Sequence, residues 1–499
     1  MRTRFALILC SLPIAVGATE PLSVIEWLGQ NPPGSGGPVL LEPPVSPGAR
    51  APEIDVTPLD QATQPVGLVP ATVTGLPADL WKGSEVDTLI RLIAAVPVSD
   101  SPAMQKLLYT LLLTETTPPE GDRAEKRLLL ARIDRLMELG ATDPAQALAE
   151  TAGPTDDAAL FARWFDATLL TGAEDTSCEA LTRLPHLAPD YAARIFCDAR
   201  RGDWQTAALL LETAHVLELM PQARLDLLDR FLSPDIFEGA PPLPAPADPD
   251  PLDFRLFETI GERLPTAPLP RAFATADLRD VAGWKAQIEA AERLTRIGAL
   301  SPNRLLGLYT EREASASGGV WDRVEAVQAF DGALTARDAA AVTRTLPPAW
   351  AAMRDVHLEV PFASLFADRL ATVDLTDPAA RDLAWRVRVL SPDLAKAPSP
   401  PGADALHRFA DALATGDPTA VPAPDALAQA IADGFAAAPS ANAEALPRGE
   451  RILRAMAAFD TGRRGNPDML SAALADLRAL GLTDTARRAA LQILLLGER

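Results

Sequence analysis

The feature that most limits the fold of this chain is its proline content, 47 prolines among 499 residues. Proline lacks a backbone N–H and its ring clashes with the preceding turn, so it interrupts long helices. The residues between the prolines are rich in alanine and leucine, which favour helices over strands. No sustained alternation of apolar and polar residues flanked by turn dipeptides is present. The sequence therefore predicts an all-α protein built from short helices.

The segment from Thr176 to Leu219 shows this organisation most clearly. Apolar residues recur at helical spacing on both sides of a short corner, Arg201–Trp204. Within the corner, Gly202 suits the left-handed position after a helix, and Asp203 is a typical N-cap for the next helix. We therefore expect two helices that meet at this corner. The same alternation of short amphipathic helices and abrupt turns continues along the chain.

Changes in composition divide the chain into segments. Proline-rich stretches interrupt the helical pattern at 231–252 and again at 397–402. Such stretches are typical of boundaries between helical blocks or of surface loops. We expect one helix over 277–297 and another over 349–373, which Pro361 interrupts or kinks. The predicted organisation is a signal peptide (1–18), a proline-rich extended arm (19–80), a first helical block (81–232), a proline-rich break (233–252), a second helical block (253–397) and a C-terminal helical block (403–499).

The N-terminal residues have the pattern of a secretory signal peptide. Arg2 and Arg4 precede an apolar stretch, Phe5–Val16, and small residues follow up to Ala18. The apolar stretch is too short for a stable transmembrane helix. Cys10 lies inside it without the small residue of a lipoprotein cleavage site, so we assign Cys10 to the removed peptide. We expect a bacterial protein that is cleaved near Ala18 and is periplasmic or secreted.

Two cysteines, Cys178 and Cys197, remain after removal of this peptide. In an oxidising compartment, an even number of cysteines indicates a disulfide. A bridge between them closes a loop of roughly 20 residues, which corresponds to about 3 kcal/mol of stabilisation. Two buried free thiols in a helical core are the alternative. The spacing matches neither a CxxC redox motif nor a zinc site.

The proline-rich arm contains a short apolar motif. Val24, Trp27 and Leu28 fall on one face of a predicted helical turn. Short apolar motifs on a tether are typical of segments that dock into a groove of a partner protein. Docking onto the chain's own helices fits the motif equally well. Further along, 54–80 keeps aliphatic residues between its prolines, and we expect it to lie along the folded body.

The chain is strongly acidic. It has 67 Asp and Glu against 46 Lys and Arg, a net charge of −21. This charge repels phosphate backbones and anionic lipid headgroups, which argues against binding of nucleic acid or of a membrane surface. The charge also suits a basic protein partner, although solubility is its first consequence. No later segment is long and apolar enough to be an integral membrane segment.

Motifs for catalysis or metal binding are not found. The four histidines form neither an HExxH motif nor an i, i+4 pair, so we expect surface or capping positions for them. The glycine-containing loop Ser315–Arg323 is compatible with anion binding, but a tight interhelical turn with Trp321 in the core is favoured. The carboxylates of Asp248–Asp253 lack the glycine and final glutamate of a calcium loop and favour a solvated acidic linker. We predict no catalytic residue, no cofactor and no metal.

The segment Ala192–Leu217, with its Gly202-Asp203-Trp204 corner and the small Ala207 and Ala208, resembles a tetratricopeptide-type helical hairpin of bacterial envelope proteins. The resemblance covers one or two hairpins. It implies hairpins stacked into an α-solenoid or superhelix with a concave, protein-binding surface. Exported lytic transglycosylases are similar in having a long helical superhelix, but their catalytic Glu-Ser motif has no counterpart in this chain.

These features favour an exported, non-enzymatic helical scaffold or adaptor for protein–protein interaction in the cell envelope. Its partner is expected to be another envelope protein, bound through the concave face or the N-terminal arm. This hypothesis rests on the architecture and on the lack of catalytic motifs. The alternative is an accessory or cryptic hydrolase acting on cell-wall glycan, which requires two carboxylates brought together in a cleft.

Overall fold

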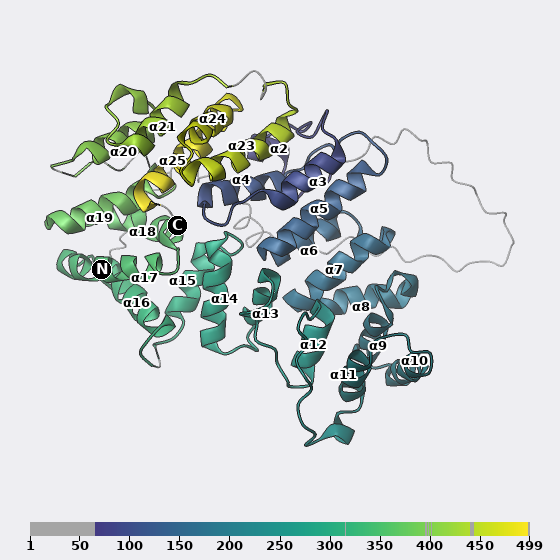
Figure 1. Ribbon diagram of the computed structural model, residues 1–499. Helices are drawn as coiled ribbons and strands as arrows, with labels where there is room; N and C mark the ends of the chain where they lie inside the picture. The colour runs from purple at the N-terminus through teal and green to yellow at the C-terminus, as the bar shows by residue number, and fades with distance from the viewer. Residues whose placement is uncertain are drawn as a thin grey trace, which may run out of the picture.

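The computed structural model describes residues 65–314, 316–394, 397, 399–400, 402–439 and 444–497. These residues form an all-α structure (Figure 1). Within these ranges, β-structure is limited to two isolated bridges, Val66–Thr116 and Val69–Thr114. The helices of the first half are α2 (Ala71–Thr74), α3 (Val86–Ala95), α4 (Pro102–Leu113), α5 (Ala124–Leu139), α6 (Thr142–Thr151), α7 (Ala158–Thr171), α8 (Glu174–Arg183), α9 (Tyr191–Arg200), α10 (Trp204–Val216), α11 (Gln222–Leu232) and α12 (Pro251–Thr259).

The second half of the chain continues with short helices. They are α13 (Ala274–Asp277), α14 (Trp284–Arg296), α15 (Pro302–Thr310), α16 (Val320–Ala336), α17 (Ala339–Arg354), α18 (Glu359–Leu370), α19 (Pro378–Val389), α20 (Ala405–Thr415), α21 (Ala426–Ala436), α23 (Arg448–Arg463), α24 (Pro467–Ala479) and α25 (Thr483–Leu496). Single 3₁₀ turns supplement them, namely η1 (Pro154–Asp156), η2 (Pro185–Leu187), η3 (Pro234–Phe237), η4 (Arg271–Phe273) and η6 (Pro418–Ala420).

Aspartate and glycine set many of the helix ends. At α7, the Asp157 side chain accepts hydrogen bonds from the N–H groups of Ala159 and Leu160, which have no partner inside the helix. Gly172 follows the same helix in the left-handed conformation, with φ of 85°. Side chains cap further helices in the same way at Asp190, Asp203, Asp250, Ser301, Asp338, Asp377, Asp404, Asp425 and Asn466. Local sequence therefore defines where these ten helices begin.

The helix boundaries predicted around Pro361 are wrong. The helix expected over 349–373 is two helices, α17 and α18, and α17 runs through Pro347 and Pro348. Between the two helices, His357 adopts the left-handed conformation with φ of 57°. Pro361 lies in the first turn of α18, where its missing N–H needs no partner. It therefore belongs to the start of a helix and does not kink one.

The helix expected over 277–297 is also divided, into α13 and α14. The residues between the two helices form a turn whose Ala282 carbonyl accepts a hydrogen bond from Gln287 Nε2 at 3.0 Å. Leu278 and Ala282 are buried within this turn. Because Leu278 and Ala282, four residues apart, both point inward, the sequence has the periodicity of a continuous helix.

Helices that follow one another in the chain pack against one another from α5 to α12. The chain then turns back, so that α12 and α13 contact α7, and η4 contacts α5. In the turn after α14, Gly298 lies against Tyr109 of α4. Figure 1 shows the second half of the chain returning beside the first, with α13 and α14 between the two halves.

The two ends of the described chain meet. Helix α25 packs against α4, and α23 packs against α3 (Figure 1). Gln492 Oε1 of α25 accepts a hydrogen bond from the N–H of Ala103 at 3.0 Å, so a side chain 389 positions away caps the start of α4. Arg463 of α23 forms an ion pair with Asp100 at 2.8 Å. These contacts close the array of helices on itself.

Trp81 is the fully buried centre of this junction. Its indole N–H donates a hydrogen bond to Thr116 Oγ1 at 2.9 Å. The N–H of Gly449, in the first turn of α23, donates to the Leu80 carbonyl at 3.0 Å. A Cβ atom at Gly449 would lie 2.5 Å from the Trp81 ring. The junction therefore requires glycine at this position.

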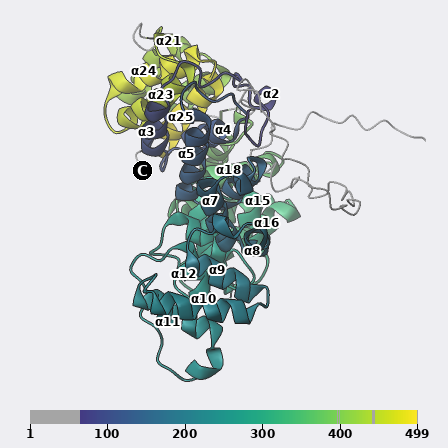
Figure 2. The same ribbon diagram turned by 90° about the vertical axis from the view of Figure 1, so that its right-hand side faces the viewer.

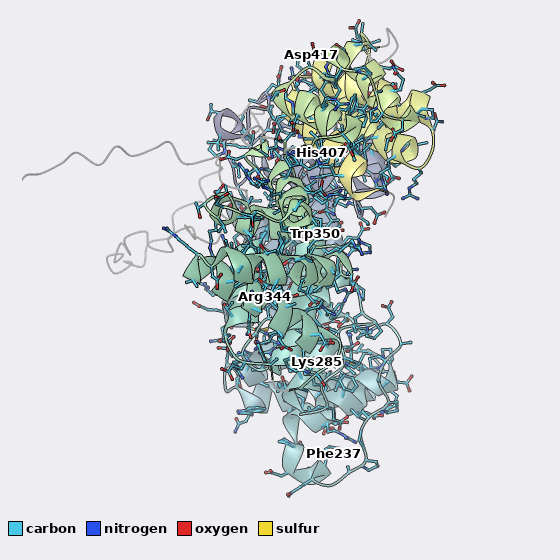
Figure 3. The ribbon with its side chains drawn as sticks, turned by 90° about the vertical axis from the view of Figure 1, so that its left-hand side faces the viewer. Phe237, Lys285, Arg344, Trp350, His407 and Asp417 are labelled. Carbon is cyan, nitrogen blue, oxygen red and sulfur yellow. A yellow bond between two sulfur atoms is a disulfide. The ribbon has the colours of Figure 1, made fainter. Side chains whose placement is uncertain are left out.

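Buried apolar side chains form a continuous cluster that extends from Leu76 to Leu495 within the described residues. The helices therefore share a core. The side views show an elongated molecule, with Phe237 at one end and Asp417 near the other (Figures 2 and 3). In the part of the chain that the structure describes, no helix combines the length and apolarity needed to cross a membrane.

Candidate protein-binding surface

A disulfide between Cys178 and Cys197 joins α8 to α9. Both cysteines are buried, and their Cα atoms are 4.9 Å apart. The bridge predicted from the sequence is confirmed. Because α9 forms a hairpin with α10, the bridge also positions α10 relative to the rest of the molecule.

The corner between α9 and α10 has the predicted geometry. Gly202 is left-handed, with φ of 86°, and the Asp203 carboxylate accepts a hydrogen bond from the Thr206 N–H at 3.1 Å. Helix α10 then packs mainly against α9 and α11. The residues that α10 buries are Ala207, Leu211 and Ala214. Helix α10 lies at the right-hand edge of Figure 1 and faces the viewer in Figure 2.

The outer side of α10 exposes large apolar side chains. Leu209 is 68% exposed and Val216 is 79% exposed, and their separation of seven residues places them on one side of the helix. Of the ten large apolar side chains most exposed among the described residues, seven lie between 191 and 236. We call five of them the α10 face: Trp204, Leu209, Val216, Leu217 and Leu219. The other two are Tyr191, at the start of α9, and Ile236, in η3.

Trp204 is the aromatic residue of the α10 face. Its ring centre lies 6.3 Å from that of Phe231, which in turn lies 5.7 Å from Phe196 in the core. Half of the Trp204 surface remains exposed. One side of the indole is therefore held by the protein, and the other is open to a partner. Such half-supported tryptophans are common energetic centres of protein interfaces.

Arg224 holds the neighbouring helices together. It forms ion pairs with Asp190 at 3.0 Å, with Asp253 at 2.8 Å and with Asp250. Burial alone lowers the pKa of Arg224, but the hydrogen bonds from its guanidinium to Asp253 and Asp250 outweigh burial and raise it. Asp250 also caps α12. The prediction of a solvated acidic linker over 248–253 is therefore wrong for Asp250 and Asp253, which fasten α11 to α12, while Asp190 fastens α11 to α9.

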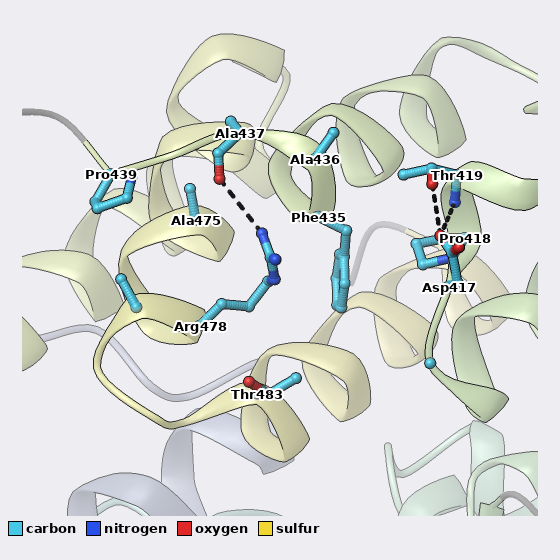
Figure 4. A pocket seen from close by; sticks show the side chains of 12 residues that line it. Asp417, Pro418, Thr419, Phe435, Ala436, Ala437, Pro439, Ala475, Arg478 and Thr483 are labelled. Atoms are coloured by element: carbon cyan, nitrogen blue, oxygen red, sulfur yellow. Dashed lines mark hydrogen bonds between the residues drawn. The ribbon is translucent and has the colours of Figure 1, made fainter.

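A cavity of about 530 Å³ lies near the end marked by Asp417 (Figure 4). The Arg478 guanidinium lies over the Phe435 ring at 5.4 Å and donates to the carbonyls of Gly434 at 3.0 Å and Ala437 at 3.4 Å. Arg478 thus caps the end of α21. Hydrogen bonds from Thr419 lower the pKa of Asp417, which caps η6. These polar groups serve helix ends, and Asp417 is the one carboxylate among the described residues that line the cavity.

A second cavity, of about 360 Å³, is lined by two carboxylates, Asp277 and Glu289. Burial raises the pKa of Asp277, and its contacts with Thr266 and Arg263 only partly offset this effect. Arg263 pairs with Asp277 at 2.6 Å. Glu289 lies 3.7 Å from Lys285 on the exposed side of α14. Two acids therefore share one cavity, which is the arrangement that the hydrolase alternative requires.

Two of the four histidines, His215 and His407, form local pairs with carboxylates. His407 Nδ1 lies 2.7 Å from Asp404, and its Nε2 lies 2.7 Å from Asp382. His215 of α10 lies 3.0 Å from Asp229 of α11. Within the described ranges, no group of three or more His, Cys, Asp or Glu side chains is arranged to hold a metal ion.

The glycine loop before α16 is a turn between helices. Ser315 is outside the described residues, and the Gly318 N–H donates to Asp322 Oδ1 at 2.7 Å. The Trp321 ring packs 5.1 Å from that of Trp284. Arg323 forms an ion pair with Glu292 at 2.7 Å. The N–H group of Gly318 is thus bonded within the protein, which agrees with the favoured interpretation of the loop.

The partner-binding residues predicted from the sequence, Val24, Trp27 and Leu28, lie outside the described residues. The α10 face is not among the sequence predictions. Its signal in the sequence is the run of leucines at 209–211, which cannot all point to one side of a helix. No family model, curated protein or solved structure matches this chain.

Proposed function

We propose that this chain is an exported, non-enzymatic helical scaffold or adaptor that binds another protein of the cell envelope through the α10 face. The observation that carries the proposal is the gathering of exposed apolar side chains on α10 and the turn that follows it. Apolar patches that remain exposed on a folded protein commonly mark interaction surfaces. Scattered single residues would carry no such meaning, but these five lie within 16 consecutive positions.

The supports of α10 favour the same proposal. The disulfide holds α9, and the ion pairs of Arg224 hold α11, so both neighbours of α10 are fixed before a partner arrives. A surface that is already ordered loses little conformational entropy on binding. The bracing therefore suits a rigid docking site.

The succession of helices that each pack against the next supports an arrangement as stacked hairpins, an α-solenoid. In solenoids, the outer face of a terminal unit is polar unless a further element covers it. The apolar outer side of α10 is therefore typical of a unit that another molecule covers.

Export is supported by the disulfide, because disulfides persist in oxidising compartments. The N-terminal signal pattern ending near Ala18 agrees with export to the periplasm or beyond. The arm motif of Val24, Trp27 and Leu28 remains part of the proposal, as a second contact with the partner.

Crosslinking in the native envelope, followed by mass spectrometry, tests the proposal. Crosslinks from residues near α10 to one protein should disappear in a Leu209→Ser, Val216→Ser variant. They should persist in the control Val281→Ser, which removes an equally exposed apolar residue elsewhere. A Trp27→Ala variant reports separately on the arm. Crosslinks that the α10 substitutions leave unchanged would place the partner elsewhere and refute the role of this face.

A hydrolase acting on cell-wall glycan is the second candidate, favoured by the shared cavity of Asp277 and Glu289. The raised pKa of Asp277 suits a proton donor. Release of soluble fragments from purified peptidoglycan should then be lost in both Asp277→Asn and Glu289→Gln. Absence of any release by the wild-type chain would exclude this candidate.

A further inference from the structure

We infer that the partner segment that covers the α10 face is cationic, an apolar helix flanked by lysine or arginine on a different protein. The inference rests on the proposed function and adds the chemistry of the partner. Two observations carry it, the shape of the apolar surface and the charges around it.

The apolar surface has the form of a helix-docking site. Leu209 and Val216 project from one side of α10, two turns apart, and Leu217 and Leu219 continue the surface beyond the helix end. Trp204, five residues before Leu209 and so more than a third of a turn away around the helix, borders this surface on the side of Phe231. The surface therefore covers the second half of α10 and the turn that follows it. A second amphipathic helix laid beside it presents apolar residues at the matching spacing of three to four.

The charges around this surface are almost entirely negative. Residues 202–253 contain ten carboxylates and two arginines. Both arginines are already bound, Arg224 by three aspartates and Arg230 by Glu262 at 2.5 Å. Arg201, at the corner before α10, is exposed but stands beside the carboxylates of Asp198 and Asp203, whose pKa values it lowers in part. A partner approaching α10 therefore meets a negative surface.

Two of these carboxylates lie within the apolar surface itself. Glu212 stands between Leu209 and Val216 on the exposed side of α10, and Glu218 stands between Leu217 and Leu219. Both are exposed, and neither pairs with another described residue. A partner that covers the leucines takes water from these carboxylates. That desolvation is unfavourable unless the partner supplies positive charges at the rim.

The same charges disfavour the chain itself as the occupant. Its own N-terminal segment, 19–64, carries six carboxylates and one arginine, with Glu20 before the apolar motif around Trp27 and Glu26 within it. A second copy would bring the same acidic surface against its own, in a chain of net charge −21. A basic segment of a different protein is the occupant with complementary charge.

Two synthetic amphipathic peptides test the inference against the purified full chain. Both carry the same face of leucine and tryptophan, but one is flanked by lysines and the other by glutamates. Fluorescence anisotropy should show that the lysine peptide binds at least about 10-fold more tightly, because complementary charge discriminates partners. The difference should shrink at high salt, since exposed charges are screened.

Substitutions in the chain separate the contribution of the carboxylates to peptide binding from that of the apolar side chains. Glu212→Gln with Glu218→Gln should weaken binding of the lysine peptide about 3- to 10-fold, as expected for two ion pairs at a rim. Glu325→Gln, an exposed glutamate on α16, is the matched control and should have no effect. Leu209→Ser with Val216→Ser should abolish binding of both peptides. Circular dichroism confirms that each variant is folded.

If the two peptides bind with equal affinity and the glutamate substitutions change neither affinity, the inference of a cationic partner is overturned. The α10 face then remains an apolar docking surface without a charge preference. Failure of both peptides to bind overturns the inference as well, while the crosslinking experiment decides the proposed function independently. Sedimentation of the wild-type chain as a dimer, with the Leu209→Ser variant monomeric, overturns it in favour of a second copy.

Discussion

Arg132 shows how a single residue can hold a segment of irregular backbone. It is buried, and its guanidinium donates to the carbonyls of Leu112 at 2.7 Å, Val66 at 2.8 Å and Thr114 at 3.1 Å. Burial lowers the pKa of Arg132 to about 10. The arginine remains charged at neutral pH and ties the N-terminal residues to the end of α4.

Replacement of Arg132 by methionine should lower the free energy of unfolding by about 3–5 kcal/mol, because three buried carbonyls lose their donors. Urea unfolding followed by circular dichroism measures this. The control is Arg344→Met, at an exposed position of α17 (Figure 3), with an expected change within about 0.5 kcal/mol. Equal effects of the two substitutions would show that these hydrogen bonds contribute little.

Asp166 of α7 gives the protein a pH dependence. Burial, followed by the negative charges of Asp250, Asp190 and Asp134, raises the pKa of Asp166 to about 7, and Arg163 offsets this only in part. Between the ordinary pKa of an aspartate and 7, the folded state holds a proton that the unfolded state has lost. The contribution of Asp166 to the free energy of unfolding is therefore largest below the ordinary pKa of an aspartate. It decreases as the pH rises towards 7 and is constant at higher pH.

The substitution Asp166→Asn removes this titration. It should raise the free energy of unfolding at pH 8 by about 3–4 kcal/mol relative to its effect at pH 4, as the difference between a folded pKa of about 7 and an ordinary aspartate pKa requires. Urea unfolding at the two pH values measures the difference. The same effect at both pH values would contradict the assignment, because a change in packing alone does not depend on pH.

At the scale of elements, close approach between segments depends on glycine. Gly449 of α23 sits against Trp81 and the Leu80 carbonyl, where a Cβ atom would lie 2.5 Å and 2.9 Å from its neighbours. Gly332 lies inside α16 and has open space where a Cβ atom would be placed. The two positions are both helical glycines, and they differ in whether a neighbour occupies that space.

Alanine should therefore have opposite effects at these positions. Gly449→Ala should destabilise by about 1–3 kcal/mol, because the ring and the backbone must move apart. Gly332→Ala should stabilise by about 0.5–1 kcal/mol, since alanine favours helix. Thermal unfolding measures both, and destabilisation by both would mean that α16 needs its glycine for a reason other than space.

The helices themselves could be predicted from local sequence, and their errors have local causes. Caps such as Asp203 and left-handed glycines such as Gly202 act within a few residues, so they are visible in the sequence. An interruption near Pro361 was predicted, but its position before the proline was not, because a proline interrupts a helix or begins one depending on where the preceding turn lies. Here the break falls at His357, four residues before Pro361, and the left-handed backbone of His357 gives no signal in the sequence.

The apolar periodicity of α10 could likewise be predicted, but its exposure could not. Leucine at 209 fits a core position as well as a binding surface. Only the arrangement of α9 and α11 decides which side of the helix is covered. The closing contact of Ala103 with Gln492 has no sequence signal either, because neither residue type indicates a partner so far away.

At the scale of the whole molecule, the hydrogen bond between Gln492 and Ala103 couples the two ends of the described chain. Gln492→Ala removes the cap of α4 and should cost about 1 kcal/mol. Hydrogen exchange should become faster in the first turn of α4, which is the measurement that checks it. The control is Gln429→Ala, an exposed residue that bonds only within α21. Unchanged exchange in α4 would show that α25 does not support it.

The meeting of α4 and α25 also determines when the protein can acquire its fold. Helix α4 is synthesised early, and the last helix of the described chain completes its core. Closing a loop of this length carries an entropic cost before the contact stabilises anything, and contacts of such sequence separation form slowly. Until then, α4 keeps apolar surface exposed to other chains. Completion of this contact must therefore wait until α25 has been synthesised, whatever order the inner helices follow.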